Sequence, residues 1–122
     1  MTYYAHSVFK YNTDVERYET SLIPGCFINP NGNVDQTKSE KEIMSDCFKL
    51  IDMCQDLVLS SFDGVIGKGV ADEIMYAFMK NMPIYYIFGN KLNKIKTIVI
   101  KPIEGSKARR IYATFDYEVV HE

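Results

Sequence analysis

Hydrophobic positions in the first 88 residues alternate between short apolar runs and longer stretches with helical spacing. The apolar runs predict four strands, over residues 3–8, 26–29, 56–62 and 82–88. The stretches between them predict three helices, over residues 12–23, 37–55 and 69–81. Strands that alternate with helices in this way favour an α/β fold, with a parallel sheet, right-handed crossovers and helices on both faces of the sheet.

Two of the expected helices begin with the spacing of a capping box, in which a Ser or Thr is followed three residues later by Glu. Thr13 and Glu16 have this spacing in the first helix, and Thr37 and Glu40 have it in the second. The second helix has one buried face, predicted to contain Ile43, Cys47, Leu50, Ile51 and Cys54. The third helix has a core stripe, predicted to contain Val70, Ile74, Ala77 and Phe78.

The pattern changes after Gly89, where two apolar runs follow each other without a helix between them. Residues 94–103 and 109–120 predict a β-hairpin, which either extends the edge of the sheet or projects as an arm. We therefore expect one domain over residues 1–122, made of an α/β core (1–90) and a C-terminal hairpin (91–122).

Composition and charge reduce the number of function classes that the chain could belong to. The 122 residues are 47% hydrophobic with a net charge of −2, so the chain has no overall basic field and no nucleic-acid polymer is expected as a partner. No apolar run is long enough to span a membrane and the first ten residues lack the features of a signal peptide, which predicts a cytoplasmic protein without membrane contact. Two histidines and three cysteines without a CxxC pair disfavour zinc, and no metal or cofactor is expected.

The stretch "SSFDGVIGKGVADEIMYA", residues 60–77, contains the strongest cluster of chemical signals. Gly64, Gly67 and Gly69 connect a strand to a helix, where backbone N–H groups and the helix N-terminus favour a phosphate. One turn into the helix, Glu73 has a carboxylate that could attack a sugar. The pattern matches neither a dinucleotide fingerprint nor a P-loop. The stretch alone therefore leaves open whether it is an active site or a cradle that only holds a ligand.

Ligands of open α/β sheets bind at the carboxyl ends of the strands, where the strand order reverses. If the order begins 2-1-3, the end of the first strand faces the end of the third, and both share one crevice with the glycines. This predicts ligand contacts from His6, Ser7, Ser61, Phe62, Gly69 and Glu73. His6 has an alternative role as a hydrogen-bonded structural residue, and Glu73 as a solvated helix residue.

Lys107, Arg109 and Arg110 form a compact basic cluster in the expected hairpin. Arginine is suited to bidentate contacts with phosphate. The alternative is a solvated sheet edge, where charges discourage pairing with another chain.

Four segments, "YYAHSVF", "INPNG", "CQDLVLSSFDGVIGKGVADEIMYA" and "MPIYYI", resemble in this order the nucleoside 2-deoxyribosyltransferase-like proteins. The resemblance implies a flavodoxin-like, deoxyribosyltransferase-like fold and a nucleoside pocket. Residues 73–77 match the Glu-x-x-Tyr-Ala element of these enzymes, in which Glu73 would be the nucleophile that takes up the sugar. In these enzymes a nearby aspartate on the preceding loop helps to hold the base and sugar. The chain departs from this pattern, because its loop residue Asp63 lies ten residues before Glu73, whereas the enzymes have a shorter segment between the two carboxylates.

The whole chain more closely resembles the phage Thoeris anti-defence 1 family. This resemblance implies a sponge without enzymatic activity, which sequesters glyco-cyclic ADP-ribose (gcADPR) made by a bacterial TIR-domain enzyme in the cytosol of the infected host. It also implies a homo-oligomer, a dimer or a trimer of dimers, with the pocket between protomers. An aromatic residue would stack on adenine and arginines would hold the pyrophosphate, roles that fall to Phe88, Asn90, Arg109 and Arg110. Some relatives also hold cyclic trinucleotides at a separate site, to which no residue is assigned.

The alternative function is that of an N-glycosidase or transferase with Glu73 as its nucleophile. A third interpretation is a nucleotide-binding subunit whose partner is unknown.

Overall fold

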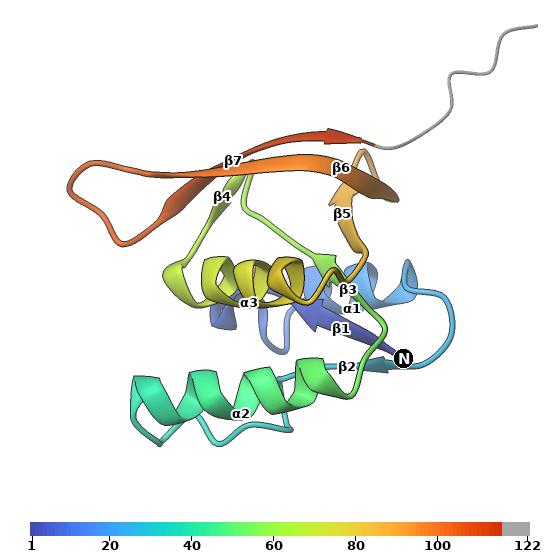
Figure 1. Cartoon of the computed structure of the whole chain (residues 1–122). Helices are drawn as coiled ribbons and strands as arrows, with labels where there is room; N and C mark the ends of the chain where they lie inside the picture. Colours follow the sequence, from blue (N-terminus) through green and yellow to red (C-terminus); the bar gives the residue numbers. More distant parts are fainter. Residues whose placement is uncertain (116–122) are drawn as a thin grey trace, which may run out of the picture.

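Seven strands form one mixed sheet in the order β2-β1-β3-β5-β6-β7-β4 in the computed structural model, which describes residues 1–115 (Figure 1). The pairs β2-β1, β1-β3 and β3-β5 are parallel, whereas the remaining pairs are antiparallel. The sheet thus begins 2-1-3, the order that was the condition for a shared crevice at the strand ends. The strands are β1 (Thr2–Ala5), β2 (Phe27–Ile28), β3 (Asp56–Leu59), β4 (Val65–Ile66), β5 (Ile84–Phe88), β6 (Lys91–Pro102) and β7 (Arg109–Phe115).

Helices cover both faces of the parallel part of the sheet. They are α1 (Asp14–Ser21), α2 (Glu40–Asp52) and α3 (Lys68–Met79), with a single 3-10 turn, η1 (Val8–Lys10), after β1. Neighbouring strand residues point to opposite faces. The Tyr4 hydroxyl accordingly donates to Glu19 of α1, and the Tyr3 hydroxyl donates to Glu73 of α3. Phe48 and Tyr76 stack where α2 packs beside α3, and α3 lies between α2 and the strands β6 and β7 (Figure 1).

Side chains cap the starts of α1 and α2, whereas α3 begins after Gly67 without a side-chain cap. Thr13 caps α1 by accepting from the Glu16 N–H, as predicted. The capping box of α2 is formed by Ser39 and Glu42, so the predicted box of Thr37 with Glu40 is wrong. The Thr37 hydroxyl instead donates to Asp35 in the preceding turn, 2.6 Å away, which removes it from the helix start.

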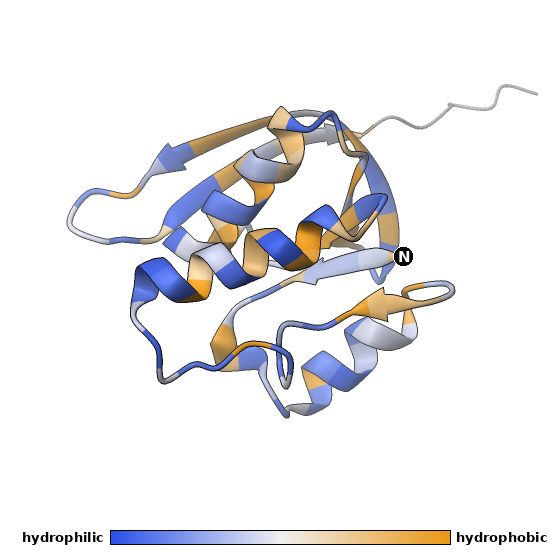
Figure 2. Cartoon of the chain, turned by 60° about the horizontal axis from the view of Figure 1, so that its bottom comes forward, coloured by the Kyte–Doolittle hydropathy of each residue, from blue (hydrophilic) through white to orange (hydrophobic). Residues whose placement is uncertain are grey.

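The C-terminal hairpin extends the sheet and bends over α3 (Figure 1). The start of β6 pairs with β5 and its remainder pairs with β7, with a register shift between Ile95 and Thr97. Such a bulge increases the local twist, which turns the inner face toward the core. Hydrophobic and hydrophilic residues alternate along the hairpin (Figure 2), and Ile98, Ile100 and Ile111 pack against the core. Residues 116–120 of the expected second strand lie outside the described residues.

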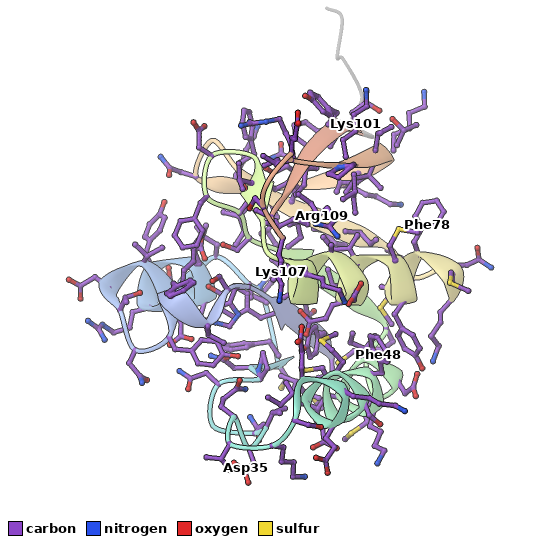
Figure 3. The ribbon with its side chains drawn as sticks, turned by 90° about the vertical axis from the view of Figure 1, so that its left-hand side faces the viewer. Asp35, Phe48, Phe78, Lys101, Lys107 and Arg109 are labelled. Carbon is purple, nitrogen blue, oxygen red and sulfur yellow. The ribbon has the colours of Figure 1, made fainter. Side chains whose placement is uncertain are left out.

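One expected core residue is exposed in the structure, and one strand was not predicted. Phe78 is 54% exposed and points away from α3 (Figure 3), because it lies about 100° around the helix from the fully buried Ala77. The two-residue strand β4, which pairs with Arg109 and Arg110, is too short to leave a pattern in the sequence.

Candidate functional site

The predicted site residues line two separate pockets, so the expectation of one shared crevice is wrong. The larger pocket, about 560 Å³, lies between the loop after β3, the β5–β6 turn and β7. Its lining includes four of the predicted residues, Ser61, Phe88, Asn90 and Arg110. The smaller pocket, about 230 Å³, lies between the end of β1 and the starts of α2 and α3. Its lining includes the predicted His6, Ser7, Gly69 and Glu73.

Two tight turns border the larger pocket. Asp63 and Gly64 have φ values of 49° and 81°, and Gly89 and Asn90 have values of 62° and 61°. Two successive residues with positive φ are typical of the type I′ turn that joins antiparallel strands. Phe62 and Val65 exchange two backbone hydrogen bonds across the first turn, at 2.8 and 3.0 Å. Both rims of the pocket are therefore formed by tight turns.

Aromatic side chains form one wall of the larger pocket. The ring of Phe88 lies 6.0 Å from that of Tyr86 and 5.7 Å from that of Phe115. Phe88 nevertheless remains 60% exposed, so an open ring face is available to a planar ligand. The Tyr86 hydroxyl lies 2.7 Å from the hydroxyl of Ser61, which accepts from the Gly64 N–H.

Arg109 and Arg110 point to opposite sides of β7, because they are neighbours in a strand. Arg110 lines the larger pocket beside Gly64. The Arg109 guanidinium instead donates to the backbone carbonyl of Ala108 at 3.1 Å. Arg110 is thus placed for a ligand in this pocket, whereas Arg109 is not.

Phe62, another predicted site residue, lines neither pocket and lies outside the larger one. Its ring is covered by the ammonium of Lys10, 4.6 Å from the ring centroid. Lys10 is only 4% exposed and also contacts Glu19 at 3.2 Å, Ser60, and the Ser61 carbonyl at 2.8 Å. Lys10 was not among the predicted site residues, since no local pattern marks a lysine that a distant loop will bury. Its contacts fix the loop that presents Ser61 to the larger pocket.

Glu73 is the main ionisable group of the smaller pocket. Its side chain is buried and accepts a hydrogen bond from the Tyr3 hydroxyl. Burial raises the pKa of Glu73 to about 7, although hydrogen bonds from Tyr3 and Cys47 favour the carboxylate. The same carboxylate helps burial to raise the pKa of the Cys47 thiol to about 12. Glu73 is therefore not a solvated helix residue, and it can hold or release a proton near neutral pH.

His6 combines a structural role with a place in the smaller pocket. Its Nδ1 lies 3.1 Å from the Tyr4 carbonyl and its Nε2 lies 2.8 Å from Glu16. Burial lowers the pKa of His6, while the Glu16 contact favours the imidazolium. Burial opposes ionisation of Glu16 too, but hydrogen bonds from Asn12 N–H, His6 and Asn31 lower its pKa. This network matches the alternative, structural interpretation of His6.

Searches of protein-family models, curated proteins and solved structures found no match to the chain. Within residues 1–115, no three His, Cys, Asp or Glu side chains come together as a metal site. None of the helices in that part of the chain has the length and hydropathy needed to cross a bilayer. Function is therefore inferred from the two pockets.

Proposed function

We propose that this protein binds and holds a cyclic ADP-ribose-type nucleotide, gcADPR, without altering it chemically. The observation that carries the proposal is the larger pocket, which combines an open aromatic face with a guanidinium. Its volume of about 560 Å³ is within the usual range of small-molecule sites, roughly 300–1,000 Å³.

Each group in the larger pocket suits one part of such a ligand. The exposed face of Phe88 suits stacking on a purine. Arg110 suits the pyrophosphate, because its planar donors match phosphate oxygens. Asn90, at the tip of the β5–β6 turn, offers an amide for a ribose hydroxyl or a base edge.

The separation of the pockets supports binding without turnover. Glu73, the carboxylate with a pKa of about 7, lines the smaller pocket and not the larger one. A ligand held by Phe88 and Arg110 therefore does not meet the residue that would act as nucleophile. Holding a ligand also requires no interaction reserved for a transition state.

The biological role is carried over from the resemblance to the Thoeris anti-defence 1 family. In this role the protein, as a homo-oligomer, sequesters the signal in the cytosol of a phage-infected bacterium and keeps the defence effector inactive. Cyclic trinucleotides are a second ligand class to examine.

Calorimetry with gcADPR tests the proposal, with Arg110→Ala and Arg109→Ala as a matched pair. Loss of a charge-assisted hydrogen bond costs about 1.5–3 kcal/mol, so Arg110→Ala should weaken binding roughly 10- to 150-fold. Arg109→Ala should bind like the parent, since Arg109 points away from the pocket. The ligand released by heat denaturation should be intact. No binding by the parent, or equal loss in both variants, would contradict the proposal.

The smaller pocket favours a second candidate, an N-glycosidase of the deoxyribosyltransferase type. The observation is the buried Glu73, held by Tyr3 and facing a cavity of about 230 Å³. The test is incubation with nucleosides and with gcADPR, followed by chromatography of the products. Free base or linear ADP-ribose that disappears in Glu73→Gln would establish the enzyme, because an amide cannot form the covalent sugar intermediate.

A further inference from the structure

Charge is strongly segregated between the two parts of the chain. Residues 91–115 hold seven of the 14 lysines and arginines but one acidic residue, Glu104, which gives this segment a formal charge of +6. Residues 1–90 hold the other seven basic residues and twelve acidic ones, a formal charge of −5. The last three acidic residues follow Phe115. The net charge of −2 therefore conceals a strongly basic hairpin.

Like charges face each other directly on the outer side of this hairpin. Lys101 is the cross-strand partner of Arg110, and both side chains are exposed. Cross-strand partners on one face lie about 5 Å apart, and like charges at this spacing destabilise a sheet. Among residues 1–115 no carboxylate forms an ion pair with either side chain; Lys101 instead lies 5.4 Å from the ring centroid of Tyr112. Such an arrangement is compensated when an anion binds nearby.

The outer side of the hairpin with Lys101 and Arg110, here called the basic face, is continuous with the larger pocket. Arg110 and Tyr112 line that pocket. Their cross-strand partners, Lys101 and Val99 respectively, lie next to them on β6 but do not line the pocket. Lys101 lies on the hairpin at the side remote from α2 (Figure 3). An anion that approaches the outer face of the hairpin is thus attracted by cations beside the pocket mouth before it reaches Arg110.

We propose that the cations of the β6–β7 hairpin outside the pocket capture a ligand with at least two negative charges and accelerate its entry. This inference rests on the proposed function, because it concerns the same pocket. Charged groups that steer a ligand without touching it change the association rate and its dependence on salt, and leave the dissociation rate almost unchanged. Lys101 pairs with the pocket residue Arg110. Lys96 follows Ile95, the partner of the pocket residue Phe115. Both lysines are exposed and neither lines the pocket, so these two cations are chosen for the test.

Stopped-flow binding of gcADPR, which carries a pyrophosphate, tests the inference. The test variant is Lys96→Gln with Lys101→Gln, which removes two charges from the hairpin. The matched control is Lys41→Gln with Lys49→Gln, which removes two charges from exposed positions on α2. Rates are measured at about 10 mM and about 1 M salt, where the screening length falls from roughly 30 Å to 3 Å.

We expect the hairpin variant to associate about three- to tenfold more slowly than the parent at low salt, within the range of steering effects. The difference should vanish at high salt, the dissociation rate should stay constant, and the α2 control should behave like the parent. Parent-like association of the hairpin variant at low salt would overturn the inference while leaving the proposed function intact. A faster dissociation rate would also overturn it, because Lys96 or Lys101 would then contact the ligand.

Two further outcomes would overturn the capture mechanism for different reasons. If the parent protein binds no gcADPR at any salt concentration, the proposed function fails and the capture mechanism fails with it. A labelled single-stranded oligonucleotide serves as the probe for a polymer. If it binds the parent more tightly than gcADPR does and loses affinity in the hairpin variant, the basic face is a nucleic-acid surface and the inference is overturned.

Discussion

Replacement of Glu73 by Gln should change how the stability of the folded protein depends on pH. Glu73 is buried beside Tyr3, and its pKa rises from 4.5 to about 7 on folding because burial disfavours the carboxylate. Glutamine has nearly the same shape and its carbonyl still accepts from the Tyr3 hydroxyl, but it never carries a charge. The substitution therefore isolates the cost of burying the carboxylate.

The sign of the effect follows from proton linkage. The folded protein holds the Glu73 proton more tightly than the unfolded chain, so the stability contribution is fully present below pH 4.5 and lost as pH rises to about 7. Each pKa unit corresponds to about 1.4 kcal/mol, so the shift from 4.5 to about 7 amounts to about 3 kcal/mol. Relative to the parent, Glu73→Gln should gain this amount between about pH 4 and pH 8.

Urea unfolding followed by circular dichroism measures the effect at a series of pH values. The difference in unfolding free energy between variant and parent is the informative quantity, because titrating groups that do not interact with Glu73 contribute equally to both proteins. Glu104→Gln, at an exposed glutamate of the hairpin loop, is the control for the loss of one surface carboxylate. If the curves of Glu73→Gln and the parent run parallel from pH 4 to pH 8, the pKa of Glu73 does not change on folding and the reasoning is refuted.

Three further predictions concern the fold and its thiols. Lys10→Met should lower the unfolding free energy by about 3–5 kcal/mol in urea titrations, because it leaves the buried carboxylate of Glu19 without its cation. Parent-like stability would contradict the network around the loop after β3. Ser39→Ala should cost about 1 kcal/mol in the same assay, whereas Thr37→Ala should cost less because it does not cap α2. Iodoacetamide at pH 8 should modify the exposed Cys26 and spare the buried Cys47, whose pKa is about 12; mass spectrometry showing the reverse order would refute this.

Local signals in the sequence determined most of the secondary structure. The apolar run at residues 56–62 and the helical spacing of Val70, Ile74 and Ala77 predicted β3 and α3, because burial on one or both faces imposes these periods. The boundaries of the helices were harder to predict. Thr37 and Ser39 both have a glutamate three residues later, and only packing selects between the two capping boxes.

Tertiary structure alone decided how the candidate residues are grouped. His6, Ser61 and Glu73 were predicted to share one crevice. The bend of β6 instead brings β7 and Arg110 over the loop after β3, which makes a second pocket there. Neighbouring side chains of β7 point to opposite faces, so Arg110 lines the pocket and Arg109 does not. These groupings depend on contacts between residues far apart in the chain, whose pairing no local period encodes, whereas helices and strands follow from the spacing of neighbouring residues.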